Sequence, residues 1–256
     1  MTEKQPRTAL VTGAAHRIGA AIARDLGAHG WAVAVHYHAS RDAAEALAED
    51  IRAGGGRAAA LPADLTVEAE TAALVPAAEA ALGPLTCLVN NASLFERDSV
   101  ADATRASWDR HMETNLRAPF LLTQAFAARL PDGAQGNIVN ILDQRVRNLT
   151  PHFASYTVSK SALWTLTRTT ALALAPRIRV NGIGPGPVLP SKRQTDDQFR
   201  RQWEGTPLGR GATPDEIAAA VRFILAAPAL TGQMIALDGG QHLAWAHPED
   251  DMPPPE

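Results

Sequence analysis

Short runs of successive apolar residues alternate along the chain with longer segments in which alanine and polar residues mix. Runs that are apolar at successive positions, rather than at every second one, are typical of strands buried on both faces of a sheet. These runs predict strands at residues 8–12, 32–37, 57–62, 85–90, 137–142, 177–183 and 233–237.

The longer alanine-rich segments predict helices. Thr213 is the expected N-cap of the last one, with Asp215 and Glu216 in its first turn. Strands that alternate with helices of this length indicate βαβ units and a parallel sheet covered on both faces, which is a Rossmann-type doubly wound α/β fold. The helices are predicted at residues 18–30, 41–53, 67–82, 107–130, 155–175 and 214–226.

The chain is expected to form a single domain, because no proline- or serine-rich linker divides residues 1–246. Residues 184–206 are the one long irregular stretch, which favours a lid or a binding loop. Residues 247–256 are acidic and proline-rich, and we expect them to be flexible.

Composition excludes several classes of function. A net charge of -3 is too close to neutral for a dedicated nucleic-acid or anionic-membrane binder. The lone Cys87 excludes an intramolecular disulfide and a thiolate-rich metal site, so no metal is expected. No apolar stretch reaches the roughly 18 residues of a membrane span, and no secretory signal is evident. We therefore expect a cytoplasmic protein.

Gly13 and Gly19 lie where the first predicted strand turns into the first predicted helix. Glycines at such a turn let the backbone approach a pyrophosphate at the helix N-terminus. Arg17 stands between them, and its guanidinium could contact a cofactor phosphate or a substrate. A tight turn without a ligand is the alternative interpretation.

The end of the second predicted strand favours NADP(H) over NAD(H). NAD-selective sites usually place an acidic residue there to bind the ribose diol. This chain has His36, His38, Ser40 and Arg41 instead, a group that suits a 2′-phosphate. Each histidine taken alone is better explained as an ordinary strand-end residue.

Tyr156 and Lys160 are four residues apart in a predicted helix and so share one face. The ammonium group can lower the pKa of the phenol, which would let the tyrosine exchange a proton near neutral pH. Such a pair is commonplace and is usually structural when nothing else accompanies it. His111, on the predicted helix 107–130, is expected at the surface.

Together these segments resemble the short-chain dehydrogenase/reductase family from residue 8 to about 243. The resemblance rests on Thr12-Gly13 with Gly19, Asn90-Asn91-Ala92, Asn115, Tyr156 with Lys160, Asn181 with Pro185-Gly186, and Asp238-Gly239-Gly240. It implies one domain with a seven-stranded parallel sheet, and a homotetramer built through the two long helices and the last strand.

The resemblance also implies roles for single residues. Tyr156 would donate a proton, Lys160 would hold the nicotinamide ribose and tune Tyr156, and Asn115 would support a water beside Lys160. Asp64 would lie near the adenine and Asn91 beside the cofactor. The residues expected to bind NADP(H) are Gly13, Arg17, Ile18, Gly19, His36, Tyr37, His38, Ser40, Arg41, Asp64, Leu65, Asn91, Ala92, Ser93, Lys160, Pro185 and Gly186.

Asp143 departs from the family pattern, in which a serine usually stands thirteen residues before the tyrosine. A hydroxyl donates to a substrate carbonyl, whereas an ionised carboxylate only accepts. Asp143 therefore argues against a simple ketone and for a nitrogen-rich heterocycle. A degenerate site with reduced activity is the alternative.

Asp143, Arg17 and the His36-Tyr37-His38 strand end together resemble the pteridine reductases and dihydromonapterin reductases. In that branch an aromatic residue after the Asn-Ala-Ser motif, here Phe95, stacks on the pterin. Ala39 departs from the branch, where a basic residue is common. The residues expected to contact the substrate are Arg17, Ser93, Phe95, Asp143 and Tyr156.

The sequence thus predicts NADPH-dependent reduction of a pterin-type C=N bond. Two alternatives stay open at this point. One is a general carbonyl or imine reductase of the same family, and the other is a catalytically quiet NADP-binding regulatory protein.

Overall fold

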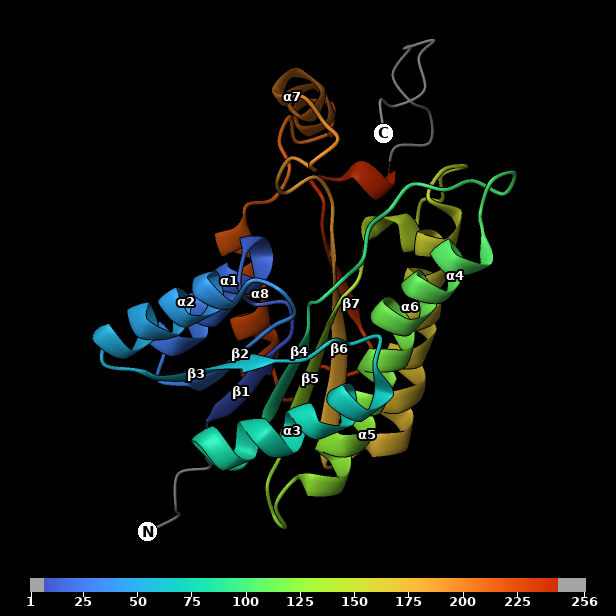
Figure 1. Cartoon of the computed structure of the whole chain (residues 1–256). Coiled ribbons are helices and arrows are strands. Elements are labelled where there is room, and N and C mark those ends of the chain that lie inside the picture. Colours follow the sequence, from blue (N-terminus) through green and yellow to red (C-terminus); the bar gives the residue numbers. More distant parts are fainter. Residues whose placement is uncertain (1–6, 244–256) are drawn as a thin grey trace.

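Seven parallel strands form one sheet in the computed structural model, which describes residues 7–243 (Figure 1). Their order in the sheet is β3-β2-β1-β4-β5-β6-β7, which confirms the predicted doubly wound fold. The strands are β1 (Thr8–Val11), β2 (Ala32–Tyr37), β3 (Arg57–Pro62), β4 (Cys87–Asn90), β5 (Gly136–Ile141), β6 (Ile178–Pro185) and β7 (Met234–Leu237).

Helices cover both faces of this sheet, as Figure 1 shows. On one face, α1 (Arg17–Ala28), α2 (Arg41–Ala53) and α8 (Pro214–Ala226) pack into one hydrophobic core. On the other face, α3 (Glu68–Leu82), α5 (Ala118–Arg129) and α6 (Ala154–Leu174) pack into a second core. Strands β1 to β6 each feed side chains into both cores, which explains why these strands are apolar at successive positions.

The strand order reverses between β1 and β4. Connections from these two strands leave in opposite directions, so a crevice opens beyond their carboxyl ends. The glycine-rich turn after β1 and the segment that begins at Asn91 after β4 therefore meet there, with the Thr12 backbone N–H donating to the Val89 carbonyl at 3.0 Å.

The predicted helix 107–130 is confirmed as a continuous helical segment over residues 105–129, but its middle turn is π-helical instead of α-helical. The structure has α4 (Arg105–Met112), a π-helical turn at Glu113–Arg117, and then α5. Pro119 supplies a physical reason, because it has no N–H to donate to the Asn115 carbonyl four residues earlier. The wider turn carries Asn115, which is fully buried.

Residues 184–206 are not wholly irregular, contrary to the prediction. Strand β6 continues to Pro185, and α7 (Asp196–Glu204) rises above the carboxyl edge of the sheet in Figure 1. Helix α7 begins with a capping box, in which the Thr195 side chain accepts from the Gln198 N–H. The Thr-x-x-Gln pattern was the available sequence signal.

The predicted N-cap of α8 is confirmed, since the Thr213 hydroxyl accepts from the Glu216 N–H at 3.2 Å.

No helix within residues 7–243 is long and apolar enough to cross a membrane. The same residues hold no group of three or more His, Cys, Asp or Glu side chains arranged for a metal ion. The predicted flexible tail at 247–256 lies outside the described residues.

Candidate active site

A cavity of about 1040 Å³ opens at the carboxyl edge of the sheet. Its wall contains the predicted site residues except two. Arg41 is exposed on α2 outside the wall, and Asn115 is buried behind it. The structure thus brings together Gly13, Arg17, Ile18, Gly19, His36, Tyr37, His38, Ser40, Asp64, Leu65, Asn91, Ala92, Ser93, Phe95, Asp143, Tyr156, Lys160, Pro185 and Gly186.

The glycine-rich turn is packed too tightly for side chains at its two glycines. A Cβ at Gly13, where φ is +60°, would lie 2.9 Å from the Ala92 Cα. A Cβ at Gly19 would lie 2.4 Å from the Gly13 carbonyl oxygen. The Asn91 amide donates to the Thr12 and Gly13 carbonyls at 2.9 and 3.1 Å. The turn is therefore a close-fitting cradle at the start of α1.

His36 supports this turn instead of offering a positive charge. Its Nδ1 accepts from the Gly13 N–H at 2.9 Å, and its Nε2 lies 3.1 Å from the Ala63 carbonyl oxygen. Burial lowers the pKa of His36 to about 4, so the ring is neutral at physiological pH. The expectation that His36 helps to neutralise a phosphate therefore needs correction.

The neighbouring His38 is exposed, and its Nε2 lies 3.5 Å from the Asp64 carboxylate. The Thr66 N–H and hydroxyl both donate to Asp64, and these hydrogen bonds lower the pKa of that carboxyl group. Asp64 is thus a fixed anion beside His38, at the end of the cavity that β2 and β3 form.

Arg17 adopts a left-handed backbone conformation with φ of +56°. Such a conformation is costly for a residue with a Cβ, and it is often retained where a side chain has a special task. Here the guanidinium donates to the Leu189 and Pro190 carbonyl oxygens at 3.1 and 2.8 Å. Arg17 therefore ties the glycine-rich turn to the segment between β6 and α7.

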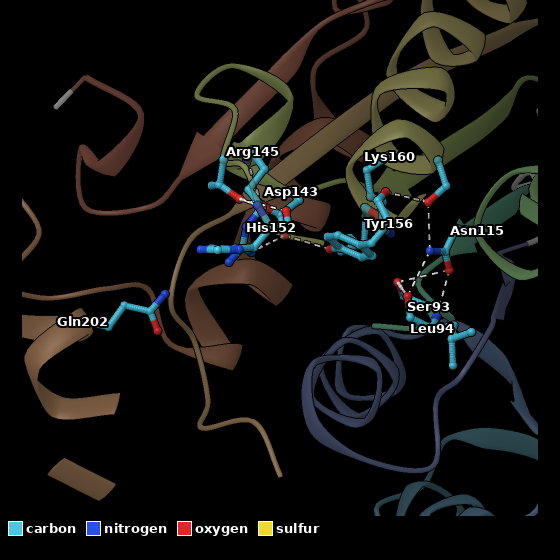
Figure 2. A network of polar contacts seen from close by, with 12 residues as sticks. Ser93, Leu94, Asn115, Asp143, Arg145, His152, Tyr156, Lys160 and Gln202 are labelled. Atoms are coloured by element: carbon cyan, nitrogen blue, oxygen red, sulfur yellow. Dashed lines mark hydrogen bonds and ion pairs between the residues drawn. The ribbon is translucent and has the colours of Figure 1, made fainter. Parts of the chain in front are cut away.

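The Tyr156 hydroxyl donates to the Asp143 Oδ2 at 2.7 Å, at the centre of the network in Figure 2. The other oxygen, Oδ1, accepts from the Arg145 backbone N–H at 2.8 Å. The Arg145 guanidinium lies 3.4 Å from Oδ2. Asp143 is therefore a fixed acceptor that directly adjoins the expected proton donor.

Lys160 is almost completely buried beneath Tyr156. Its ammonium group donates to the Ile141 carbonyl at 2.8 Å and lies 5.9 Å from the centre of the Tyr156 ring. Desolvation lowers the pKa of Lys160 to about 8, although the nearby Asp143 carboxylate acts in the opposite direction. The Lys160 ammonium group therefore loses its proton closer to neutral pH than an exposed lysine does.

Asn115 holds a loop on the cavity wall in place. Its amide nitrogen donates to the Leu94 carbonyl at 2.9 Å and to the Ser159 hydroxyl at 3.0 Å. Its amide oxygen accepts from the Leu94 N–H at 2.8 Å. The π-helical turn thereby connects α6 to the segment that carries Phe95, as Figure 2 lets the reader follow through Leu94. The expected water beside Lys160 stays a prediction.

Phe95 belongs to an aromatic group with Phe153 and Tyr156. The sequence predicted Phe95 and Tyr156 as site residues, but not Phe153. The Phe95 ring stacks on Phe153 at 4.4 Å and meets Tyr156 edge-on at 4.7 Å. The Arg145 guanidinium lies 5.4 Å from the Phe95 ring centre. The sequence gives no signal for Phe153 or Arg145, because neither lies in a motif. Their places depend on contacts between segments far apart in the chain.

The chain is similar in sequence to known oxidoreductases. A family model described as enoyl-(acyl carrier protein) reductase matches residues 13–242. An uncharacterized oxidoreductase from Methylorubrum extorquens is 37% identical over 248 residues, covering 94% of this chain and 99% of its own. The 3-oxoacyl-[acyl-carrier-protein] reductase FabG from Staphylococcus epidermidis is 32% identical over 242 residues, covering 93% and 99%.

A solved structure is more similar still. FolM alternative dihydrofolate reductase 1 from Brucella canis, in complex with NADP, superposes with a TM-score of 0.92 at 50% sequence identity. The match covers 94% of this chain and 96% of that one.

Arg17→Lys should loosen the segment between β6 and α7. Lysine keeps the positive charge but loses the planar pair of donors that reaches both carbonyls. Because a hydrogen bond to a charged group contributes about 1.5–3 kcal/mol, amide hydrogens of residues 187–195 should exchange at least about tenfold faster. Hydrogen exchange followed by mass spectrometry measures this. Arg24→Lys, on the exposed side of α1, is the matched control. Equal exchange rates of residues 187–195 in the two variants would show that Arg17 does not hold this segment in place.

Lys160→Met should change how stability depends on pH. Burial lowers the pKa of Lys160 from 10.5 to about 8, so between these values the unfolded chain binds more protons than the folded one. The free energy of unfolding of the parent should therefore rise with pH, by about 3 kcal/mol relative to the variant once pH 10.5 is reached. Urea unfolding at a series of pH values tests this, and parallel curves for the parent and the variant would show that folding does not lower the pKa of Lys160.

Proposed function

The chain belongs to the short-chain dehydrogenase/reductase family, and we propose that it uses NADPH to reduce a C=N bond of a pterin-type dihydropteridine. The FolM structure, half identical to this chain and in complex with NADP, supports both the cofactor and the substrate class. The competing activity within the family is carbonyl reduction, which the FabG relatives favour.

The site fits a dinucleotide. The glycine-rich turn has no room for a Cβ at Gly13 or Gly19, and it places the start of α1 at the cavity, as phosphate binding requires. A cavity of about 1040 Å³ lies at the upper end of the range for ligand sites, which leaves room for a second small molecule. Asn91 and Lys160 are the side chains best placed to hold the nicotinamide end, and the bound cofactor supplies a hydride.

The hydrogen bond between Tyr156 and Asp143 is the observation that carries the proposal on the substrate. It puts an obligate acceptor directly beside the proton donor. A ketone offers only an acceptor, so its partly negative oxygen would be repelled by the Asp143 carboxylate. A pterin edge offers N–H groups to Asp143 and a ring nitrogen to Tyr156, so both protein groups are satisfied at once.

The neighbouring side chains complete this arrangement. The Phe95 ring supplies a flat apolar surface on which a pterin can stack. The Arg17 guanidinium can leave the Leu189 and Pro190 carbonyls for the oxygen side of the pterin or for a cofactor phosphate. The Lys160 ammonium stabilises the negative charge on Tyr156 when its proton passes to the ring nitrogen. Which ring bond is reduced decides whether Tyr156 or water gives that proton.

We also propose that the chain forms a homotetramer in the cytoplasm. Apolar side chains are exposed on the helices expected at the subunit contacts, with Trp108 40%, Val158 43% and Leu172 83% exposed. Contact with another copy would remove these surfaces from water. The lone Cys87 fits a reducing compartment, because the fold needs no disulfide.

The function is tested by following the loss of nicotinamide absorbance from NADPH with dihydropteridines, and with ketones and 3-oxoacyl thioesters as comparison substrates. We expect turnover of the dihydropteridine. Asp143→Ser should lower kcat/KM for it by about 10- to 100-fold, because a hydrogen bond to a charged group is lost. Asp132→Ser, at an exposed carboxylate remote from the cavity, is the matched control and should leave the rate unchanged.

Three results would speak against the proposal. Turnover of ketones or thioesters without pterin turnover would favour the carbonyl reductase. A protein that binds NADPH and reduces nothing would favour a regulatory role. Unchanged pterin turnover in Asp143→Ser would remove Asp143 from substrate recognition.

A further inference from the structure

A buried polar network lies beside Tyr156, whose ring meets that of His111 edge-on at 6.1 Å. It joins Asp98, Ser155 and His111, which are 5%, 0% and 0% exposed. The Ser155 hydroxyl donates to the Asp98 carboxylate, and its oxygen lies 2.7 Å from the His111 Nδ1. The expectation that His111 lies at the surface is therefore wrong. Burying three polar side chains is costly unless each is satisfied.

The hydrogen bonds fix the protonation of the His111 ring. Its Nε2 faces the Glu96 backbone N–H at 3.1 Å, so this nitrogen must act as the acceptor. The proton consequently resides on Nδ1, which faces the Ser107 carbonyl at 3.0 Å as well as Ser155. Burial lowers the pKa of His111, which favours the same neutral ring.

Both neighbours of Phe95 in the chain are held by buried side chains. Asn115 binds the Leu94 N–H and carbonyl, and His111 accepts the Glu96 N–H. The intervening Phe95 has one face against Phe153 and lies on the cavity wall. Arg110 also donates to the Glu96 carboxylate at 2.7 Å and Arg193 to the Phe95 carbonyl at 3.1 Å, but both contacts are exposed. The bond to His111 is the one from a buried side chain to the backbone on the Glu96 side of Phe95.

The other end of the network fixes the start of α6. The Asp98 backbone carbonyl accepts from the Phe153 N–H at 2.8 Å and the Ala154 N–H at 3.3 Å, and its carboxylate accepts from the Ser155 N–H at 3.1 Å. These bonds satisfy N–H groups at the first turn of α6, for which Phe153 provides no side-chain cap. Tyr156 is the next residue, and its ring meets His111 edge-on at 6.1 Å.

We propose that His111 is a positioning residue that sets Phe95 at the distance and angle from Tyr156 that the substrate ring requires. Through Nε2 it orders the loop that carries Phe95, and through Nδ1 it connects that loop to the start of α6. The inference rests on the proposed function only where it takes Phe95 to be the ring that stacks on the substrate. The ordering of the loop by His111 can be tested without any substrate.

Two substitutions of His111 distinguish the hydrogen bond at Nε2 from the contact at Nδ1. A glutamine amide reaches about as far as Nε2, so His111→Gln can still accept the Glu96 N–H. An asparagine amide reaches only about as far as Nδ1, so His111→Asn keeps the contact with Ser155 and leaves the Glu96 N–H without its acceptor. In hydrogen exchange on the ligand-free full chain, residues 94–97 should exchange at least about tenfold faster in His111→Asn, while His111→Gln stays within about threefold of the parent.

Steady-state kinetics with NADPH and a dihydropteridine give the second readout. His111→Asn should raise KM for the dihydropteridine about tenfold with kcat and KM for NADPH nearly unchanged, because the loop must be ordered when the substrate binds. His111→Gln should restore KM to within about threefold of the parent. A purely structural role would lower stability and active fraction in both variants and leave this KM alone.

A measurement on the parent keeps the proposal testable if the variants fold poorly. NMR of isotope-labelled histidine should show the His111 proton on Nδ1, and a proton on Nε2 would overturn the proposal. Equal exchange of residues 94–97 in parent and His111→Asn would overturn it too. If His111→Asn loosens the loop but no dihydropteridine is reduced, His111 still orders the loop, and it is the proposed function that fails.

Discussion

A parallel sheet requires that every connection return over a face of the sheet, and this requirement places the whole site. The order reverses between β1 and β4, so the connections from these strands diverge and leave the carboxyl edge open. The glycine-rich turn follows β1, the Asn91 segment follows β4, and Asp143 follows β5. Residues that are far apart in the chain thus line one cavity without any strand leaving the core.

The proposed chemistry depends on Asp143, a carboxylate at the position where the family resemblance leads us to expect a hydroxyl. Asp143 accepts from Tyr156, and the backbone N–H and guanidinium of Arg145 hold it in place. Lys160 lies below the same phenol with its charge maintained at a cost in desolvation. Burying Lys160 lowers stability, but it completes a site in which the donor Tyr156 lies beside the acceptor Asp143. The edge of a heterocyclic substrate matches this donor and acceptor better than a lone carbonyl does.

Much of the fold was predictable because burial on both faces gives the strands a simple apolar signature. The glycine-rich turn and the Tyr156–Lys160 pair were recognisable because each depends on local spacing. The π-helical turn was missed, although Pro119 was a signal for it. The burial of His111 and the stack of Arg145 on Phe95 carry no local signal, since they depend on segments that only the folded chain brings together. The expectation that His36 contributes positive charge to a phosphate site failed for the same reason. Its position at a strand end gives no indication of its burial or of the hydrogen bond from the Gly13 N–H, and burial keeps the ring neutral.

We propose that Asp143 and Tyr156 together recognise a hydrogen-bond donor and an adjacent acceptor on the substrate. The most direct test is a crystal structure of the protein with NADP and a dihydropteridine. In that complex we expect an N–H group of the pteridine to donate to the Asp143 carboxylate, and the Tyr156 hydroxyl to have turned from Asp143 to the substrate. A pteridine bound on the cavity wall away from Asp143, with the bond between Tyr156 and Asp143 still intact, would contradict it.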